Sequence, residues 1–138
     1  MKIRLDDVMQ SFSYPFNAVY YYYIPLETVL MFVRGAIYGK AVHGISTLED
    51  VRRHKEDFIR LPEIGDEGRR KVMMSFLDML GDVKAKKRLR ETAEEGVQSF
   101  ENALGEERLL LTWYNYRDDI YREFSLRWGK ENGLDIIG

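Results

Sequence analysis

The stretch TWYNYRDDIYREFSLRW, residues 112–128, has the densest aromatic pattern in the chain and decides how the fold is read. At about 100° per residue its large side chains fall within one arc of less than half a turn. This arc contains Trp113, Tyr114, Tyr116, Ile120, Tyr121, Phe124 and Trp128. The opposite side contains Asp118, Asp119, Arg122 and Glu123. The pattern predicts an amphipathic helix over about 108–130 whose aromatic stripe packs against a core.

Arg117 interrupts this stripe, because its direction lies near the middle of the aromatic arc. An unpaired buried guanidinium is very costly, so we expect a carboxylate, carbonyl groups, stacked rings or an anionic ligand beside it. One interpretation is a structural ion pair or cation-π stack whose head reaches water, and the other is an anion or partner site. Arg117, Tyr114 and Tyr121 are therefore candidate binding residues.

Composition places the chain among ordinary globular proteins. It has 138 residues, 45% hydrophobic and 32% charged, which excludes disordered and collagenous classes. We expect a single domain over 1–138, with a hairpin-containing part at 1–62 and a helical part at 63–138. The formal net charge of -2 supplies no general basic field for nucleic acid.

The chain contains no cysteine, which excludes disulfides, cysteine-ligated metals and thiol catalysis. Its longest apolar run, 18–33, is interrupted by Pro25 and Glu27, so it does not suit a membrane span of about 20 residues. The first ten residues carry two aspartates where a signal peptide needs an apolar stretch. We expect a soluble, cytoplasmic protein.

The N-terminal part predicts a helix followed by a hairpin. IRLDDVMQSF (3–12) has apolar residues at helical spacing, and YPFN (14–17) ends that helix. Two β-rich runs, 18–24 and 29–34, flank a proline-containing turn, which indicates a hairpin. A lone hairpin is barely stable in water, so DFIRLP (57–62) is the expected third strand.

The hairpin contains four consecutive tyrosines, Tyr20 to Tyr23. Side chains alternate along a strand, so two of the four should point away from the core. Exposed tyrosines at a sheet edge suit partner docking or strand addition, and a helix or a second subunit could equally cover them. Tyr21 and Tyr23 are candidate binding residues, with a homodimer as one possible arrangement.

The remaining chain predicts helices. Ser46 with Glu49 has the spacing of a capping box for a helix through about Lys55. A second helix over 65–81 has an apolar face of Val72, Met73, Phe76, Met79 and Leu80. Apolar residues recur at helical spacing from Asp82 onward, and Gly96 predicts two helices or one kinked helix. The fold class is α+β: a small antiparallel sheet built on the hairpin and covered by four or five helices.

No pattern names a reaction. The chain contains no phosphate-binding glycine loop, GxSxG elbow or HExxH helix, and His43 and His54 share no ligand spacing. No catalytic residue, metal or cofactor is assigned. We expect a non-catalytic interaction module that binds a protein partner or itself. One alternative is single-stranded RNA or other nucleic-acid binding through KAKKRLR (84–90), and a second is a small hydrolase using Arg117, a histidine and carboxylates.

Four segments, taken in order, resemble uncharacterised protein family 0158, a group of small bacterial proteins without an assigned activity. They are DFIRLPE, MMSFLDMLGD, RLRETAEEGVQSFENAL and WYNYRDDIYREFSLRWGKENGLDII. The opening helix and YYYIPLETV agree more loosely, and the likeness omits about 35–55. The resemblance implies an α+β fold and a bacterial cytoplasmic origin, and it implies no reaction. Arg117 matches the family's usual basic position after the aromatics.

Two departures from the family pattern concern function. Glu27-Thr28 runs directly into VLMF, where the family usually continues with Gly-Glu. After Gly96 the chain reads VQSFENAL, where the family tends to carry a Gly-Ala-Phe-Arg-Arg-Phe-Lys-like segment. If those basic residues hold a phosphate or an RNA in the family, this chain lacks them at that place.

Overall fold

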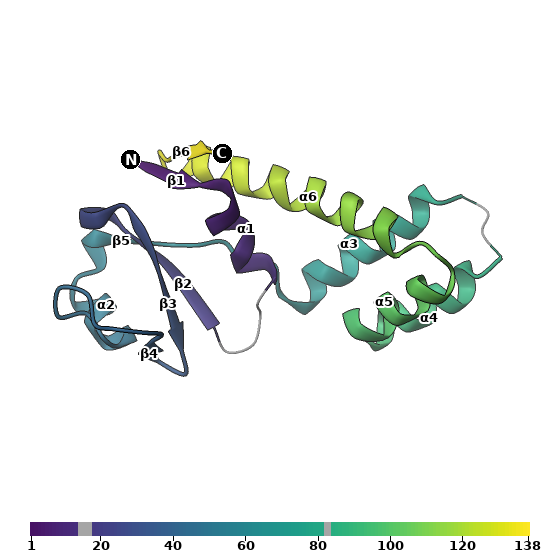
Figure 1. Ribbon diagram of the computed structural model, residues 1–138, viewed down its shortest axis with the longest axis horizontal. Helices are drawn as coiled ribbons and strands as arrows, with labels where there is room; N and C mark the ends of the chain where they lie inside the picture. The colour runs from purple at the N-terminus through teal and green to yellow at the C-terminus, as the bar shows by residue number, and fades with distance from the viewer. Residues whose placement is uncertain (14–17, 82–83) are drawn as a thin grey trace. The chain divides into compact units, whose positions relative to one another are not determined.

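The structure, a computed structural model, describes three ranges of the chain: 1–13, 18–81 and 84–138 (Figure 1). These residues form two compact units. Unit 1 comprises Met1–Glu63 and Arg122–Gly138, and unit 2 comprises Ile64–Tyr121. Unit 1 contains a four-stranded sheet, and the described elements of unit 2 are helices. The predicted α+β class is confirmed, and the expected single domain stays a prediction.

The predicted hairpin is confirmed. Strand β2 (Ala18–Tyr23) pairs antiparallel with β3 (Thr28–Val33), from Ala18 opposite Val33 to Tyr23 opposite Thr28. A short 3-10 turn, η1 (Ile24–Leu26), joins the two strands. Pro25 suits this turn because its fixed φ favours the first positions of a helical turn.

Two further strands complete this sheet. The predicted third strand is confirmed as β5 (Phe58–Arg60), which pairs antiparallel with β2. The other neighbour, β4 (Ala36–Ile37), pairs with β3 and was not predicted. The strand order is β4-β3-β2-β5. A strand of two residues in a glycine-rich stretch is too short to show the alternation that marks a strand in sequence.

A second, unpredicted sheet joins the ends of the chain. Strand β1 (Lys2–Arg4) pairs parallel with β6 (Asp135–Ile137), so Ile3 lies opposite Ile136 (Figure 1). The predicted first helix follows β1 directly as α1 (Leu5–Ser13). Pairing across more than 130 residues leaves no local signal in the sequence, because neither three-residue strand shows a period by itself.

Both faces of the four-stranded sheet are covered within unit 1. One face packs into a cluster of Ile3, Val8, Tyr20, Tyr22, Leu61, Trp128 and Leu134. The other face packs into a cluster of Tyr23, Leu30, Phe32, Ile45, Val51 and Phe58. Adjacent residues of β2 therefore enter different cores, as the alternation of side chains along a strand requires.

The predicted capping box exists one residue later than expected. Helix α2 (Leu48–Arg53) has Thr47 as its N-cap, whose hydroxyl accepts from the backbone N–H of Asp50 at 3.3 Å. The Asp50 carboxylate accepts in return from the Thr47 backbone N–H at 3.0 Å. Asp50 replaces the predicted Glu49 because it is the third residue after the cap once Thr47 is the cap. The 3-10 turn η2 (Lys55–Asp57) follows α2.

Unit 2 consists of α3 (Gly65–Met79), α4 (Lys86–Glu95), α5 (Val97–Glu106) and the first part of α6 (Leu110–Glu131). The two predicted helices on either side of Gly96 are confirmed, since Gly96 has a φ of +139° that ends α4. The expected aromatic helix is confirmed as α6. It is continuous across the boundary between the units after Tyr121.

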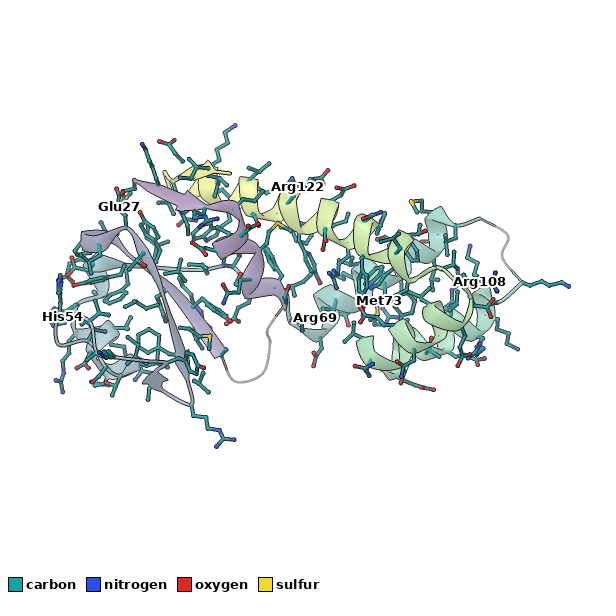
Figure 2. The ribbon with its side chains drawn as sticks, in the orientation of Figure 1. Glu27, His54, Arg69, Met73, Arg108 and Arg122 are labelled. Carbon is teal, nitrogen blue, oxygen red and sulfur yellow. The ribbon has the colours of Figure 1, made fainter. Side chains whose placement is uncertain are left out.

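The core of unit 2 is aromatic. The ring of Phe76 lies 5.3 Å from that of Trp113, and Phe100 lies 5.2 Å from Trp113, both centroid to centroid. Met73, labelled in Figure 2, is buried as predicted. Met79, predicted on the same face, is 54% exposed, and Leu77 is fully buried instead. The buried stripe of α3 therefore includes Leu77 and ends before Met79.

Two predictions lie outside the described residues: the helix end at 14–17, and the start of the following helical pattern at Asp82 and Val83. Among the described helices, none has the length and apolar content to cross a membrane.

Candidate functional site

The hairpin tyrosines are less accessible than predicted. Tyr20, Tyr22 and Tyr23 are buried, at 4%, 0% and 5% exposure, and Tyr21 is half-buried. The tyrosines alternate between the two faces as expected, but the expectation that the outer pair is exposed is wrong, because this small sheet has a core on each face. Residues from the chain's own α2 region and its two ends cover the rings.

The edges of the sheet are also occupied. The Trp128 indole N–H donates to the carbonyl of Arg60 on β5 at 3.2 Å. At the other edge, the Ile37 N–H donates to the Ser46 carbonyl at 2.8 Å, and the Leu48 N–H to the Gly35 carbonyl at 3.0 Å. Strand addition needs free backbone groups, so these bonds disfavour it here.

Tyr23 contacts one of the two histidines. Its hydroxyl lies 3.2 Å from Nδ1 of His43, and the two rings meet edge to face with centroids 5.8 Å apart. His54 lies beyond α2 at the surface (Figure 2). Ligand-bearing atoms of His54, Glu56 and Asp57 lie within 4.8 Å of one another. Such exposed groups are common on protein surfaces, so the cluster by itself assigns no metal.

Arg117 has the surroundings predicted for it. Its guanidinium carbon lies 4.7 Å from the ring centroid of Tyr114 and 5.8 Å from that of Tyr121. Nη2 donates to Asp118 at 3.0 Å, and Nη1 lies 3.6 Å from the carboxylate of Glu101. The expectation of carboxylates and stacked rings is confirmed. A binding role for these residues stays a prediction.

Tyr121 is the deepest member of this group. It is 4% exposed, and burial raises the pKa of its hydroxyl, although the nearby Arg117 charge acts in the opposite direction. The hydroxyl therefore stays protonated at neutral pH. Tyr114 is half-buried, and the Arg117 side chain is 25% exposed. The rings hold the arginine in place and leave only part of it accessible.

Sequence reasoning missed Glu101 on α5. Its carboxylate accepts from the indole N–H of Trp113 at 2.8 Å and faces Arg117 as well. Only its position beside the buried Phe100 could have suggested such a role, and that position does not identify the partner. The structure thus brings Arg117, Tyr114 and Tyr121 together within unit 2, whereas Tyr21 and Tyr23 belong to unit 1.

The basic segment 84–90 is partly neutralised. Arg88 binds Glu106 and lies 3.5 Å from Glu107, and Arg90 lies 3.7 Å from Asp78. The hydrogen bond to Glu106 raises the pKa of Arg88. Both arginines join helices of unit 2 through these exposed pairs, which weakens their attraction for phosphate.

The structure also contains a hollow that sequence reasoning did not identify. It lies in unit 1 and is lined by Phe12, Pro62, Glu63, Phe124, Arg127, Trp128 and Glu131. The four residues from α6 occupy positions i, i+3, i+4 and i+7, which places them on one face of the helix. That spacing was the signal available in the sequence, but it also suits a helix packed against a core.

Aromatic rings form the apolar part of the hollow. Phe12 is 2% exposed and meets Phe124 edge to face, with centroids 6.1 Å apart. Trp128 is 9% exposed and is fixed by its hydrogen bond to Arg60. Buried and hydrogen-bonded rings keep their orientation without a ligand, so this surface is preformed.

Three charged residues and Pro62 form the rest of the lining. Glu63 is paired with Arg60 at 2.5 Å. The guanidinium carbon of Arg127 lies 6.0 Å from the Phe124 ring centroid, within cation-π range. Among the described residues, the lining contains no serine, cysteine or histidine, and its carboxylates are those of Glu63 and Glu131. The arrangement can hold an apolar group between charges.

No curated protein and no solved structure matches the chain. One family model does match, and it spans residues 1–137, including the stretch at about 35–55 that the sequence resemblance omitted. The chain therefore belongs to the Uncharacterised protein family (UPF0158).

Proposed function

We propose that this protein is a non-catalytic interaction module that receives one apolar group of a partner or ligand in the hollow between α1 and the end of α6. The observation that carries the proposal is the hollow itself, with three preformed aromatic rings and charged groups at the rim. Aromatic surfaces flanked by polar groups are typical of binding sites.

The size of the hollow limits what it can receive. Its volume is about 200 Å³, below the roughly 300 to 1,000 Å³ of typical ligand pockets. A nucleotide or a large cofactor therefore does not suit it. One amino-acid side chain or one compact small molecule does.

A second contact surface in this proposal is formed by Tyr114 and Arg117 on unit 2. Tyrosine and arginine are frequent among residues that dominate binding energy at interfaces. Arg117 is already oriented by its stacking on Tyr114, so little side-chain entropy would be lost on contact. Tyr121 would hold Arg117 in position, because its buried ring also lies beside the guanidinium. Tyr21 and Tyr23 would act indirectly, by holding the sheet.

The proposal places the module in a bacterial cytoplasm, with a protein partner or a second copy of the chain as an alternative occupant. The absence of cysteine and the family resemblance support this setting. The hydrolase alternative has less support, since Arg117 already contacts two carboxylates and His43 contacts Tyr23.

The two tryptophans of the chain allow a direct test, because Trp128 lines the hollow and Trp113 is buried in unit 2. We would titrate the ¹⁵N-labelled full-length protein with indole and follow both indole N–H signals. We expect the Trp128 signal to move in a saturable manner while the Trp113 signal stays in place. Absence of movement at Trp128, or equal movement at both, would overturn the proposal.

Matched variants on the same helix sharpen this test. Phe124→Ala removes a ring from the hollow and should weaken indole binding several-fold. Leu126→Ala changes a residue that is 48% exposed and does not line the hollow, so it should leave binding unchanged. Equal effects of both variants would argue against this site.

A further inference from the structure

We infer that the hollow binds a free α-amino acid with a compact apolar side chain, in its zwitterionic form. Arg127 would hold its carboxylate and Glu131 its ammonium group, while the side chain lies on Phe124 and Trp128. This inference rests on the proposed function and names the ligand class of the same site.

The two charged residues of the inferred site lie on one face of α6. Arg127 and Glu131 lie four residues apart on α6, so their Cβ atoms are about 6 Å apart on one face of the helix. Phe124 and Trp128 share that face, and all four line the hollow. A positive and a negative group therefore lie beside one aromatic surface. Their separation is short enough for one small zwitterion to contact both of them.

The charges of Arg127 and Glu131 are available to a ligand. Among the residues that the structure describes, neither Arg127 nor Glu131 takes part in an ion pair, with each other or with another group. Glu63, the third charged group of the lining, is already paired with Arg60. Arg117, Arg70 and Arg88 likewise all have carboxylate partners. Among the described residues, the rim of the hollow thus has one arginine and one glutamate without an ion-pair partner.

Arginine and glutamate side chains recognise the two charged groups of a zwitterion. A guanidinium binds a carboxylate with two parallel hydrogen bonds, and a carboxylate binds an ammonium group through charge-assisted ones. A residue within a peptide chain carries neither charge, and a peptide end carries only one. A free amino acid carries both, and a volume of about 200 Å³ suits a molecule of that size.

The experiment compares two ligands that share a side chain and differ in whether their amino and carboxyl groups are charged. L-leucine has both charges, and N-acetyl-L-leucine amide has neither but keeps the side chain. Each would be titrated into the ¹⁵N-labelled full-length protein while the Trp128 indole N–H signal is followed. We expect L-leucine to bind at least ten-fold more tightly than its blocked analogue.

Variants of Arg127 and Glu131 test whether these two residues bind the charged groups of L-leucine. Arg127→Gln and Glu131→Gln should each weaken L-leucine binding about ten-fold and leave binding of the blocked analogue unchanged. Lys130→Gln changes a neighbouring exposed charge outside the hollow and should have no effect. Unchanged L-leucine binding in both rim variants would overturn the inference.

The outcomes separate this inference from the proposed function. Equal binding of L-leucine and the blocked analogue would overturn the zwitterion inference and leave the binding module standing. If neither leucine ligand nor indole moves the Trp128 signal, both ideas are wrong. Dispersed spectra of every variant would show that lost binding does not reflect unfolding.

Discussion

The carboxylate of Glu101 joins two side chains of α6: it accepts a hydrogen bond from the Trp113 indole at 2.8 Å and lies 3.6 Å from the Arg117 guanidinium. Both charged side chains are largely removed from water, at 25% exposure for Arg117 and 19% for Glu101. The arginine that interrupts the aromatic stripe is therefore part of the packing between α5 and α6.

We predict a measurable coupling between these two residues. A double-mutant cycle of Arg117→Met and Glu101→Gln should give a coupling free energy of unfolding of about 1 kcal/mol. This value lies between those typical of exposed ion pairs and of buried ones. Glutamine can still accept from Trp113, so the cycle isolates the charge interaction. Urea unfolding of the four proteins would measure it.

The exposed pair Arg52 and Glu49 serves as the control. Their side chains are 74% and 58% exposed, and their nitrogen and oxygen lie 3.2 Å apart. We expect a coupling below about 0.5 kcal/mol there. A coupling at Arg117 no larger than this would contradict a structural role for the Arg117–Glu101 pair.

Gly129 near the end of α6 should not tolerate a side chain. A Cβ there would lie 2.6 Å from Cγ1 of Ile136 and 3.3 Å from the Leu134 carbonyl oxygen. We expect Gly129→Ala to lower the free energy of unfolding by about 1 to 3 kcal/mol. Gly105→Ala on α5 meets nothing within 4 Å and should instead raise it by up to about 1 kcal/mol. Thermal unfolding would compare them, and a stabilising Gly129→Ala would refute the close contact.

The cap of α2 should make stability depend on pH. Backbone hydrogen bonds from Ser46 and Thr47 lower the pKa of the Asp50 carboxyl below its usual 3.8. At pH values above 3.8, the ionised Asp50 cap therefore contributes fully to the free energy of unfolding. This contribution is lost as the pH falls through the lower pKa of the folded state. We expect Asp50→Asn to be less stable than the parent at pH 6, with the difference shrinking below about pH 4. Melting temperatures across this range would test it, and a constant difference would count against it.

We predict that the two units unfold together. Helix α6 crosses from unit 2 into unit 1 without a break, and a helix interrupted at that point would lose hydrogen bonds on both sides. Trp128→Phe leaves Trp113 to report on unit 2, and Trp113→Phe leaves Trp128 to report on unit 1. Each variant would be followed by both its fluorescence and its far-ultraviolet circular dichroism during urea unfolding. Coincident midpoints within each variant are expected, and separate midpoints would show two domains.

The basic segment 84–90 should not bind single-stranded RNA. Arg88 and Arg90 are paired with acidic residues, and only lysines of the segment keep unpaired charges among the described residues. We expect unchanged RNA mobility in gels at about 50 mM salt, where phosphate contacts are stronger than at physiological salt. Glu106→Gln with Glu107→Gln would free Arg88 and serves as the comparison. A shift by the parent protein that disappears when the lysines are replaced would revive the nucleic-acid alternative.

Elements with a local signature were predictable. The spacing of Val72, Met73 and Phe76 indicated α3, and the two β-rich runs around Pro25 indicated the hairpin. The cap of α2 was misplaced by one residue, because serine and threonine are both favoured N-caps and Ser46 directly precedes Thr47. Met79 was misjudged because a helical stripe indicates which side is apolar but not where the core ends.

The candidate sites were predictable only in part. Arg117 was noticed because its charge conflicts with its place on the helix, and the need for a partner followed from the cost of burying it. That the partner is Glu101 followed from the packing of α5 on α6. The hollow was missed because Phe12 and Phe124 are more than 100 residues apart in the chain.

The amino-acid sequence by itself determined the helices, the hairpin and the α+β class, because periodicity and turn chemistry act between near neighbours. Only the tertiary structure decided that both faces of the hairpin are buried, that β1 pairs with β6, and that aromatic rings from α1 and α6 form a hollow. The physical reason is that an apolar period records that a surface is buried, whereas the identity of what buries it depends on contacts between distant segments.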